Sequence, residues 1–396
     1  MNYCKKCLFP ETKPDLYFDD AGICDACHSA DRKHGLLNAI DWKKKAQQFE
    51  DLVKNAKQMK KGIYDCIVPV SGGKDSTYQV LRAKNKHEMK VLAVTFDQFD
   101  QTDIGRYNIK ILQEIGVDHI HFTLSPIVVK KLVKKGLELV GDPYWVNHVG
   151  MFTVPYIMAA NFQTPLVIFG ENPQFEFGGP KASRDSFIMD KRWRQEFGGM
   201  RGLRESDMID LEISEADLLA LNFPSDEKVK DANVMGIFYG SFYKWDIGKQ
   251  LPLVEEIGWK RLLHPPQGSW VDYENCDMKF IDIRERIKFL KFGYGRATDQ
   301  INIEIRNGRI SREEGLSIVK EMDGKVSKKN ENDFCNLLEI SRQEYLTIID
   351  SFVNNAFFAV QGNVGFNSFQ SVFGSTGIKW NGTTIMTVSG VVNPII

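Results

Sequence analysis

The sequence has no long apolar run. A membrane-spanning helix needs about 18–20 consecutive apolar residues, and no stretch of the 396-residue chain approaches that length. The first residues carry charge and two cysteines, where a secretory signal would place its apolar core. We therefore expect a cytoplasmic protein that makes no use of a membrane.

A charge excess of either sign is also missing. The chain has 51 basic and 52 acidic residues, which gives a net charge of −1. Proteins whose main task is to hold nucleic acid usually carry a basic excess, so we do not expect nucleic acid as a partner. Hydrophobic residues make up 43% of the chain, which is ordinary for a globular protein with a large core.

Cysteines are few, and four of the seven lie close to the N-terminus. Cys4 and Cys7 form one Cys-x2-Cys pair, Cys24 and Cys27 form another, and 16 residues separate the pairs. Two such pairs suit a tetrahedral Zn²⁺ in a closed, structural site, although four cysteines also suit an iron–sulfur cluster. We predict a zinc-binding unit over residues 1–40.

Strands and helices alternate in the next part of the chain. The pattern predicts strands at 66–70, 91–96, 119–122 and 166–169, and helices at 41–61, 77–83, 104–115, 127–140 and 151–161. This alternation is typical of a doubly wound, mainly parallel α/β sheet. Ligands of such sheets bind beyond the carboxyl ends of the strands.

The second half of the chain is less regular. Residues 173–278 show no clear period, and helices are expected only at 281–292, 312–323 and 344–352. Residues 359–396 contain a single charged residue, Lys379, and are compatible with strands or with poor order. The predicted division is a zinc unit (1–40), an α/β domain (41–278), a helical substrate or partner region (279–358) and a tail without an assigned role (359–396).

A loop with adjacent glycines, Ser71-Gly-Gly-Lys-Asp-Ser76, follows the first strand and opens a helix. Glycines let the backbone approach an anion closely, and the N–H groups of a helix N-terminus favour phosphate. The two serines add hydroxyl donors, Lys74 adds a positive charge, and Asp75 suits Mg²⁺. A Walker A loop is excluded because it has four residues between its glycines.

This loop resembles the PP-loop of the ATP pyrophosphatase superfamily, whose members include GMP synthetase, asparagine synthetase and tRNA thiolation enzymes. The resemblance implies the adenine nucleotide alpha hydrolase-like fold and ATP with Mg²⁺ as cofactors. It also implies a shared reaction, in which a substrate oxygen attacks the α-phosphorus of ATP, pyrophosphate leaves, and a nucleophile then displaces AMP. The expected nucleotide contacts are Val70, Ser71, Gly72, Gly73, Lys74, Asp75, Ser76, Phe96, Asp97, Gly170 and Glu171.

The strand at 166–169 ends in Gly170-Glu171-Asn172, which we expect to face the same cleft as the loop. We predict that Glu171 and Asn172 contact metal or substrate, with a helix-cap or loop role as the alternative. The residues selected for catalysis are Lys74, Asp75, Ser76 and Glu171.

Three later segments narrow the resemblance. They are Gly170-Glu-Asn-Pro-Gln174, Gly268-Ser-Trp270 with Tyr273-Glu-Asn-Cys276, and Leu290-Lys-Phe-Gly-Tyr-Gly-Arg-Ala-Thr-Asp299. With the cysteines and the loop, they resemble the N-acetyl sugar amidotransferase family over roughly residues 1–358. The resemblance implies that the acetamido group of a bacterial surface sugar becomes an acetamidino group during lipopolysaccharide or O-antigen biosynthesis.

The implied substrate is a nucleotide-linked di-N-acetylated uronic acid or a legionaminic- or pseudaminic-type precursor. We expect Asn172, Lys291, Tyr294 and Arg296 to contact this sugar. The alternative for Lys291 and Arg296 is that they belong to a basic helix face.

The reaction needs a source of ammonia. Cys66, Cys276 and Cys335 are scattered, and none lies in the Gly-x-Cys-x-Gly turn typical of a glutaminase nucleophile. The resemblance implies that a separate glutaminase and a barrel subunit, like those of imidazole glycerol phosphate synthase, supply ammonia. Two alternatives stay open: a tRNA-modifying PP-loop enzyme, and a non-enzymatic nucleotide-binding scaffold for the glutaminase and barrel.

Overall fold

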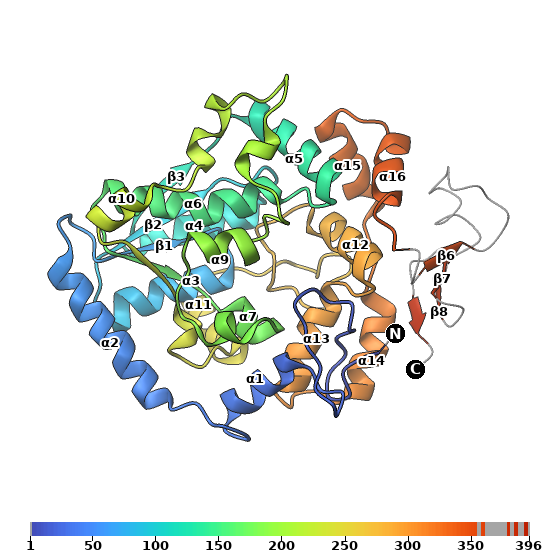
Figure 1. Ribbon diagram of the computed structural model, residues 1–396, viewed down its shortest axis with the longest axis horizontal. Helices are drawn as coiled ribbons and strands as arrows, with labels where there is room; N and C mark the ends of the chain where they lie inside the picture. Colours follow the sequence, from blue (N-terminus) through green and yellow to red (C-terminus); the bar gives the residue numbers. More distant parts are fainter. Residues whose placement is uncertain (1, 355–357, 361–377, 381–383, 387–391, 395–396) are drawn as a thin grey trace.

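A computed structural model describes residues 2–354, 358–360, 378–380, 384–386 and 392–394. A parallel sheet lies at the centre of the α/β part, with helices on both of its faces (Figure 1). Within the described residues, no helix combines the length and the apolar character needed to cross a membrane.

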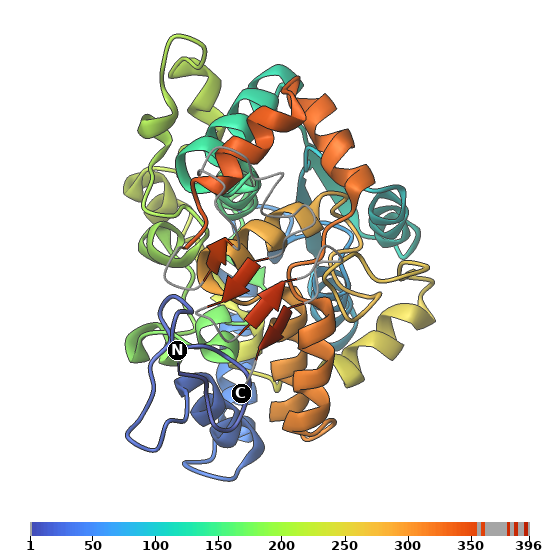
Figure 2. The same ribbon diagram turned by 90° about the vertical axis from the view of Figure 1, so that its right-hand side faces the viewer.

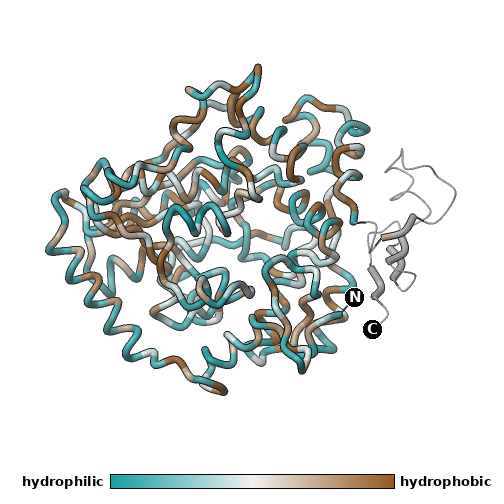
Figure 3. Tube along the Cα trace, viewed as in Figure 1, coloured by the Kyte–Doolittle hydropathy of each residue, from teal (hydrophilic) through white to brown (hydrophobic). Residues whose placement is uncertain are grey.

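The central sheet has five parallel strands in the order β3-β2-β1-β4-β5. The strands are β1 (Cys66–Pro69), β2 (Val91–Phe96), β3 (Asp118–Phe122), β4 (Leu166–Phe169) and β5 (Met235–Phe238). The first four confirm the strands predicted from the sequence, and the doubly wound α/β class is confirmed as well. The fifth lies in the stretch that showed no period. In Figure 3 the strands form much of the hydrophobic interior of the trace.

Successive strand residues face opposite sides of the sheet, as strand geometry requires. Cys66 and Val68 pack in a cluster with α2 (Trp42–Met59), α3 (Lys74–Leu81) and α4 (Asp103–Glu114). Ile67, between them, packs in a second cluster with α5 (Pro126–Val140) and α6 (Trp145–Asn161). Burial on both faces explains why the central strands are apolar throughout rather than alternating.

The helical region after the sheet consists of α12 (Ile281–Phe292), α13 (Arg296–Arg306), α14 (Arg312–Met322), α15 (Lys328–Leu338) and α16 (Arg342–Asp350). Ile283, Ile287 and Phe334 belong to the same buried cluster as α5 and α6. This region therefore shares a core with the α/β domain and is fixed against its α6 side.

Short helices fill residues 173–278. They are α7 (Pro173–Phe177), α8 (Lys181–Asp185), α9 (Lys191–Phe197), α10 (Asp226–Asp231) and α11 (Ile247–Glu256), with 3₁₀ turns at Glu205–Met208, Ala216–Leu221 and Tyr239–Ser241. A π-helical turn at Arg82–Lys86 extends α3. Most of the short helices within 173–278 have too few turns to show a hydrophobic period, so no periodic pattern marks them in the sequence.

The N-terminal cysteine unit ends in α1 (Asp25–His34) and lies beside α13 and α14 (Figure 2). The Leu8 N–H donates to Asn302 Oδ1 at 2.7 Å, and Arg312 Nε donates to the Cys7 carbonyl at 3.1 Å. The unit is thus attached to the helical region, although some 250 residues lie between them in the sequence.

The described parts of the tail are four short strands in an antiparallel sheet: β6 (Phe358–Val360), β7 (Ile378–Trp380), β8 (Thr384–Met386) and β9 (Val392–Pro394). Strands were one of the two expectations for this segment. The other residues of the segment 359–396, for which strands or poor order were expected, lie outside the described residues.

Candidate active site

The glycine loop lies where the sheet topology favours ligand binding. β1 and β4 are neighbours, and the strand order runs outward from them in both directions. This is the switch point of a doubly wound sheet, and the crevice at its carboxyl edge is the usual ligand site. The loop after β1 and Gly170-Glu171 after β4 both line this crevice.

The two glycines of the loop have different roles. Gly72 has φ +94°, and a Cβ there would lie 2.3 Å from the carbonyl oxygen of Gly105 in α4. Only glycine fits such a close approach with a left-handed backbone. A Cβ on Gly73 would meet nothing closer than Ser71 Oγ at 3.5 Å. Gly72 is therefore a packing residue that does not line the cavity, whereas Gly73 does line it.

The loop is held through its carbonyl oxygens. Gln101 Nε2 (2.8 Å), Trp259 Nε1 (2.9 Å) and Ser76 Oγ (3.1 Å) donate to the carbonyls of residues 71, 72 and 73 in turn. The first N–H groups of α3 have no partner within the helix. With its acceptors occupied, the loop offers an excess of donors, which suits a phosphate.

A cavity of about 400 Å³ extends from this loop. One wall is apolar and consists of Phe96, Met151, Phe152, Pro155, Phe169 and Phe238. Another part of the lining is polar and includes Glu274, Asp277, Arg284 and Arg296 from the C-terminal part of the chain. A flat apolar base and a charged phosphate group can therefore be accommodated in the same cavity.

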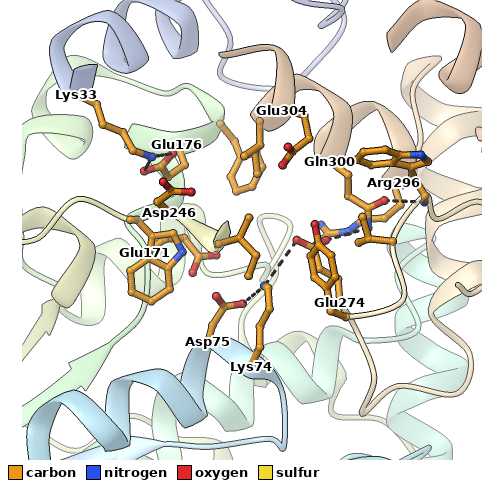
Figure 4. Close-up of a pocket in the computed structure, with 17 residues that line it drawn as sticks. Lys33, Lys74, Asp75, Glu171, Glu176, Asp246, Glu274, Arg296, Gln300 and Glu304 are labelled. Carbon is orange, nitrogen blue, oxygen red and sulfur yellow. Dashed lines mark hydrogen bonds and ion pairs between the residues drawn. The ribbon is translucent and has the colours of Figure 1, made fainter. Parts of the chain in front are cut away.

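A smaller cavity of about 70 Å³ adjoins the first, and both are lined by Lys74, Asp75, Glu171, Glu274 and Arg296 (Figure 4). Lys74 Nζ lies 2.6 Å from Asp75 Oδ2 and 3.7 Å from Glu274 Oε1. Arg296 Nη2 lies 2.6 Å from the other oxygen of Glu274. Glu274 thus joins the loop lysine to an arginine of the helical region.

This network keeps its members charged. Burial disfavours the charged form of Lys74, but Asp75 and Glu274 outweigh it and raise the lysine pKa. Burial likewise disfavours ionised Glu274, yet Arg296 and Lys74 lower its pKa to about 2. The Nε of Arg296 is buried without a hydrogen-bond partner, so the guanidinium keeps a donor for a bound group.

Glu171 is the least satisfied carboxylate of the site. It lines both cavities, and no hydrogen bond or ion pair connects it to another described side chain. Burial, followed by the nearby Asp75 carboxylate, raises its pKa to about 7. Asp75 Oδ1 is also buried without a partner. Two neighbouring carboxylates with open oxygens fit a Mg²⁺ ion, which would remove their mutual repulsion.

Asp277 and Glu274 were not assigned from the sequence. Asp277 is 5% exposed and accepts a hydrogen bond from Gln98 Nε2 at 2.9 Å. Burial raises its pKa. Both acids lie in or next to Tyr273-Glu-Asn-Cys276, a segment that carried the family resemblance without any role for its carboxylates. The position of both acids in or beside this segment is the sequence signal that could have identified them.

The structure corrects the expectation for Asn172. Its side chain is buried, and Oδ1 accepts hydrogen bonds from the Gln174 and Phe175 N–H groups at 3.0 and 3.3 Å. Its Nδ2 donates to carbonyl oxygens of the 183–186 segment. The amide caps α7, so it has no free atom for substrate or metal, and the helix-cap alternative applies.

Two of the expected sugar contacts also lie elsewhere. Lys291 Nζ donates to the Val140 carbonyl at 2.7 Å, and Tyr294 packs edge-on against Phe9 in the cysteine unit. Neither lines the cavity. The chain reverses at Gly293, which has φ +77° and ends α12. Side chains on either side of this turn face different neighbours, and within the Lys291–Arg296 segment only Arg296 reaches the cavity.

Of the expected adenine neighbours, Phe96 lines the cavity and Asp97 does not. Asp97 Oδ1 lies 3.1 Å from His121 Nε2, and Asp97 Oδ2 accepts a hydrogen bond from Thr123 at 3.2 Å. Its carboxylate therefore faces the β3 side of the sheet. Val70, Ser71, Ser76 and Gly170, the remaining expected nucleotide contacts, do line the cavity.

The four N-terminal cysteines meet in one buried cluster. Their sulfurs all lie within 4.8 Å of one another, with Cys4 to Cys27 at 3.8 Å and Cys7 to Cys24 at 3.6 Å. A tetrahedral zinc with Zn–S bonds of about 2.3 Å places its sulfurs about 3.8 Å apart. The spacing is therefore compatible with a four-thiolate zinc site. The nearby His28 pairs with Asp19 instead.

Residues 267–372 match the family model described as "LPS biosynthesis protein WbpG-like, C-terminal domain". The match includes Glu274, Asp277 and Arg296, and it extends past residue 358, where the family resemblance was expected to end. No curated protein is significantly similar to the chain. The solved NMN synthetase from Francisella tularensis is 13% identical, with a TM-score of 0.28 over 57% of this chain and 99% of that one, a likeness too distant to carry an argument.

Proposed function

We propose that this chain, with its WbpG-like C-terminal domain of the lipopolysaccharide biosynthesis type at residues 267–372, is an ATP-dependent, amidine-forming N-acetyl sugar amidotransferase. The acetamido oxygen of a bacterial sugar attacks the α-phosphorus of ATP, and pyrophosphate leaves. Ammonia then attacks the amide carbon, and AMP leaves with the former acetamido oxygen. The products are an acetamidino sugar, AMP and pyrophosphate.

The observation that carries the proposal is the composition of the cavity. Gly73 and the start of α3 present donors for a pyrophosphate, and the lining around Phe96 and Phe152 is apolar, as an adenine site requires. Asp75, whose Oδ1 has no partner, and Glu171 line the same cavity. This is the combination needed for attack at the α-phosphorus.

The chemistry explains why ATP is consumed. An amide carbon resists ammonia because its oxygen is a very poor leaving group, and adenylation converts that oxygen into part of AMP. Lys74 and Arg296 would offset the negative charge that develops on the phosphates. Mg²⁺, if held by Asp75 and Glu171, would add charge stabilisation there.

The thiols of the α/β and helical regions support an external source of ammonia. A glutaminase nucleophile must be a reactive thiolate. Burial raises the pKa of Cys276 to about 12 and that of Cys335 to about 11, and it also raises the pKa of Cys66. Such pKa values keep these thiols protonated at neutral pH, which also speaks against sulfur transfer of the tRNA-thiolation type. The proposed donors are a separate glutaminase and a barrel subunit.

The test is mass spectrometry of candidate acetamido sugars incubated with the protein, ATP, Mg²⁺ and ammonium. Replacement of O by NH lowers the sugar mass by about one unit, and AMP and pyrophosphate should appear in equal amounts. Asp75→Asn is the control, because it removes a carboxylate charge without changing side-chain size. Pyrophosphate release that requires added tRNA, or none with any di-N-acetylated sugar, would refute the proposal.

A further inference from the structure

The cavity contains a buried amide that the rest of the protein leaves unsatisfied. Asn147, in the first turn of α6, is 5% exposed and lines the cavity. Neither its Oδ1 nor its Nδ2 forms a hydrogen bond with the described residues. Buried polar groups are nearly always paired, and an unpaired one lowers stability. Because the amide also lines the cavity, both of its polar atoms are available to a bound group.

Two other buried asparagines of the protein behave differently. Asn108 is fully buried, and its amide both donates to the Lys260 carbonyl and accepts from the Lys260 N–H, each at 2.8 Å. Asn172 uses both amide atoms to cap α7. Asn147 is thus the exception among these three, and it is the one that lines the cavity.

His148, the neighbour of Asn147, adds a second polar side chain to this corner of the cavity. His148 also lines the cavity, and its Nδ1 has no hydrogen-bond partner. Gly199 packs against the ring so closely that a Cβ would lie 2.6 Å from His148 Cγ. Burial and the nearby Arg284 lower the His148 pKa to about 3. The imidazole is therefore uncharged and fixed in place.

Arg284 also lines this corner of the cavity, and two acids bind its guanidinium. Its Nε lies 3.1 Å from Asp142 Oδ1, and its Nη1 lies 3.1 Å from Glu285 Oε1. Because both acids already offset its charge, this corner suits an uncharged polar ligand better than a further anion. The apolar wall around Phe152, by contrast, suits the adenine ring.

The complement of a side-chain amide is a group that offers one donor and one acceptor, as a secondary amide does. The reacting acetamido oxygen must stay free to attack phosphorus, since an oxygen that accepts a hydrogen bond from Asn147 would be a weaker nucleophile. A different acetamido group fits Asn147 without this loss of nucleophilicity.

We infer that Asn147, with His148 beside it, binds a second, non-reacting acetamido group of the sugar substrate. The inference rests on the proposed function. It assigns to Asn147 and His148 the recognition of the acetamido group that the reaction leaves unchanged. Asn147 is then a specificity residue that contacts substrate and takes no part in bond making or breaking.

The experiment measures sugar binding by titration calorimetry with the α,β-methylene analogue of ATP and Mg²⁺ present. The probes are a UDP-linked 2,3-diacetamido uronic acid and the two monoacetamido sugars that retain one acetamido group each. Asn147→Leu should weaken binding of the diacetamido sugar, and of one monoacetamido sugar, by about tenfold to a hundredfold. Binding of the other monoacetamido sugar and of the ATP analogue should not change.

Asn161→Leu is the matched control, because Asn161 ends the same helix and is exposed; it should bind every probe as the wild type does. The melting temperature of ligand-free Asn147→Leu should equal or exceed that of the wild type, since a structural amide would lower it on removal. Weaker binding of the ATP analogue, or unchanged binding of all three sugars, would overturn the inference. If the wild type binds no sugar at all, the proposed function fails and the inference fails with it.

Discussion

Lys33 and Glu176 form an ion pair of 2.8 Å in which the two side chains are only 3% and 12% exposed. Lys33 belongs to α1 of the cysteine unit, and Glu176 lies in α7, just beyond β4. Both line the smaller cavity, which Lys74 and Asp75 line as well (Figure 4). The cysteine unit therefore forms part of the wall of the candidate active site.

We predict that Lys33→Met destabilises the protein and impairs the site. Removing one partner of a buried ion pair leaves the other charge unpaired in a poorly solvated place, which costs about 3 kcal/mol of unfolding free energy. Urea denaturation measures the loss, and nucleotide binding should weaken with it. Lys6→Met is the matched control, because the Lys6–Asp31 pair of the same unit is more exposed and should cost about 1 kcal/mol or less. Equal losses in the two variants would contradict the prediction.

A second prediction concerns the metal. Cys24→Ser should remove one zinc ligand, lower the metal content of the purified protein and lower its melting temperature, because metal-binding energy is folding energy in small closed sites. Metal content is measured by mass spectrometry. Cys335→Ala, which changes a buried thiol far from the cluster in sequence, should keep the full metal content. If the wild type shows absorption bands typical of iron–sulfur clusters, the four cysteines hold such a cluster and not zinc.

The two loop glycines should respond differently to alanine. Gly72→Ala places a Cβ against the Gly105 carbonyl at a positive φ, so it should destabilise the protein by about 2 kcal/mol or more. Gly73→Ala has room and should fold normally, but its methyl group would stand where phosphate approaches and should weaken ATP binding about tenfold. Thermal unfolding and nucleotide titration separate the two effects. Normal ATP binding by folded Gly73→Ala would argue against phosphate at the loop.

The strands and the phosphate loop were predictable because their signals are local. β2 contains five apolar residues among its six, all of them buried, and the loop follows β1 directly. β5 was missed because it is a four-residue run at the sheet edge, among short helices without a period. Its pairing with β4 depends on residues almost seventy positions earlier in the sequence, and no local pattern reports that.

The candidate site was predictable only in part for the same reason. Glu274 and Asp277 reach the loop from some two hundred residues away, through contacts such as the Thr102 N–H donating to the Asp277 carbonyl at 3.2 Å. A segment resemblance marks a stretch of chain, but it does not say which side chains face the cavity. That is why the segment led to the selection of both Lys291 and Arg296, although only Arg296 lines the cavity.

The last prediction is a pH dependence that Glu171 alone should cause. Its pKa is about 7 in the folded protein, against an ordinary value of 4.5. A raised carboxyl pKa means that the folded state disfavours the charged form. The wild type should therefore lose up to about 3 kcal/mol of stability from this group as the pH rises from about 4.5 to 7. Glu171→Gln carries no such charge, so it should be more stable than the wild type at pH 8 and equally stable below pH 4.5.

Denaturation of both proteins across this pH range, without nucleotide, measures the difference. Burial also raises the pKa values of Asp100 and Asp323, to about 7 and about 6, but these groups are common to both proteins and cancel in the comparison. Mg²⁺ should stabilise the wild type at pH 8 more than the variant, since a cation at Asp75 and Glu171 favours the charged carboxylates. Parallel pH profiles would mean that Glu171 titrates as an ordinary surface acid. An equal response of both proteins to Mg²⁺ would instead mean that the ion binds without Glu171.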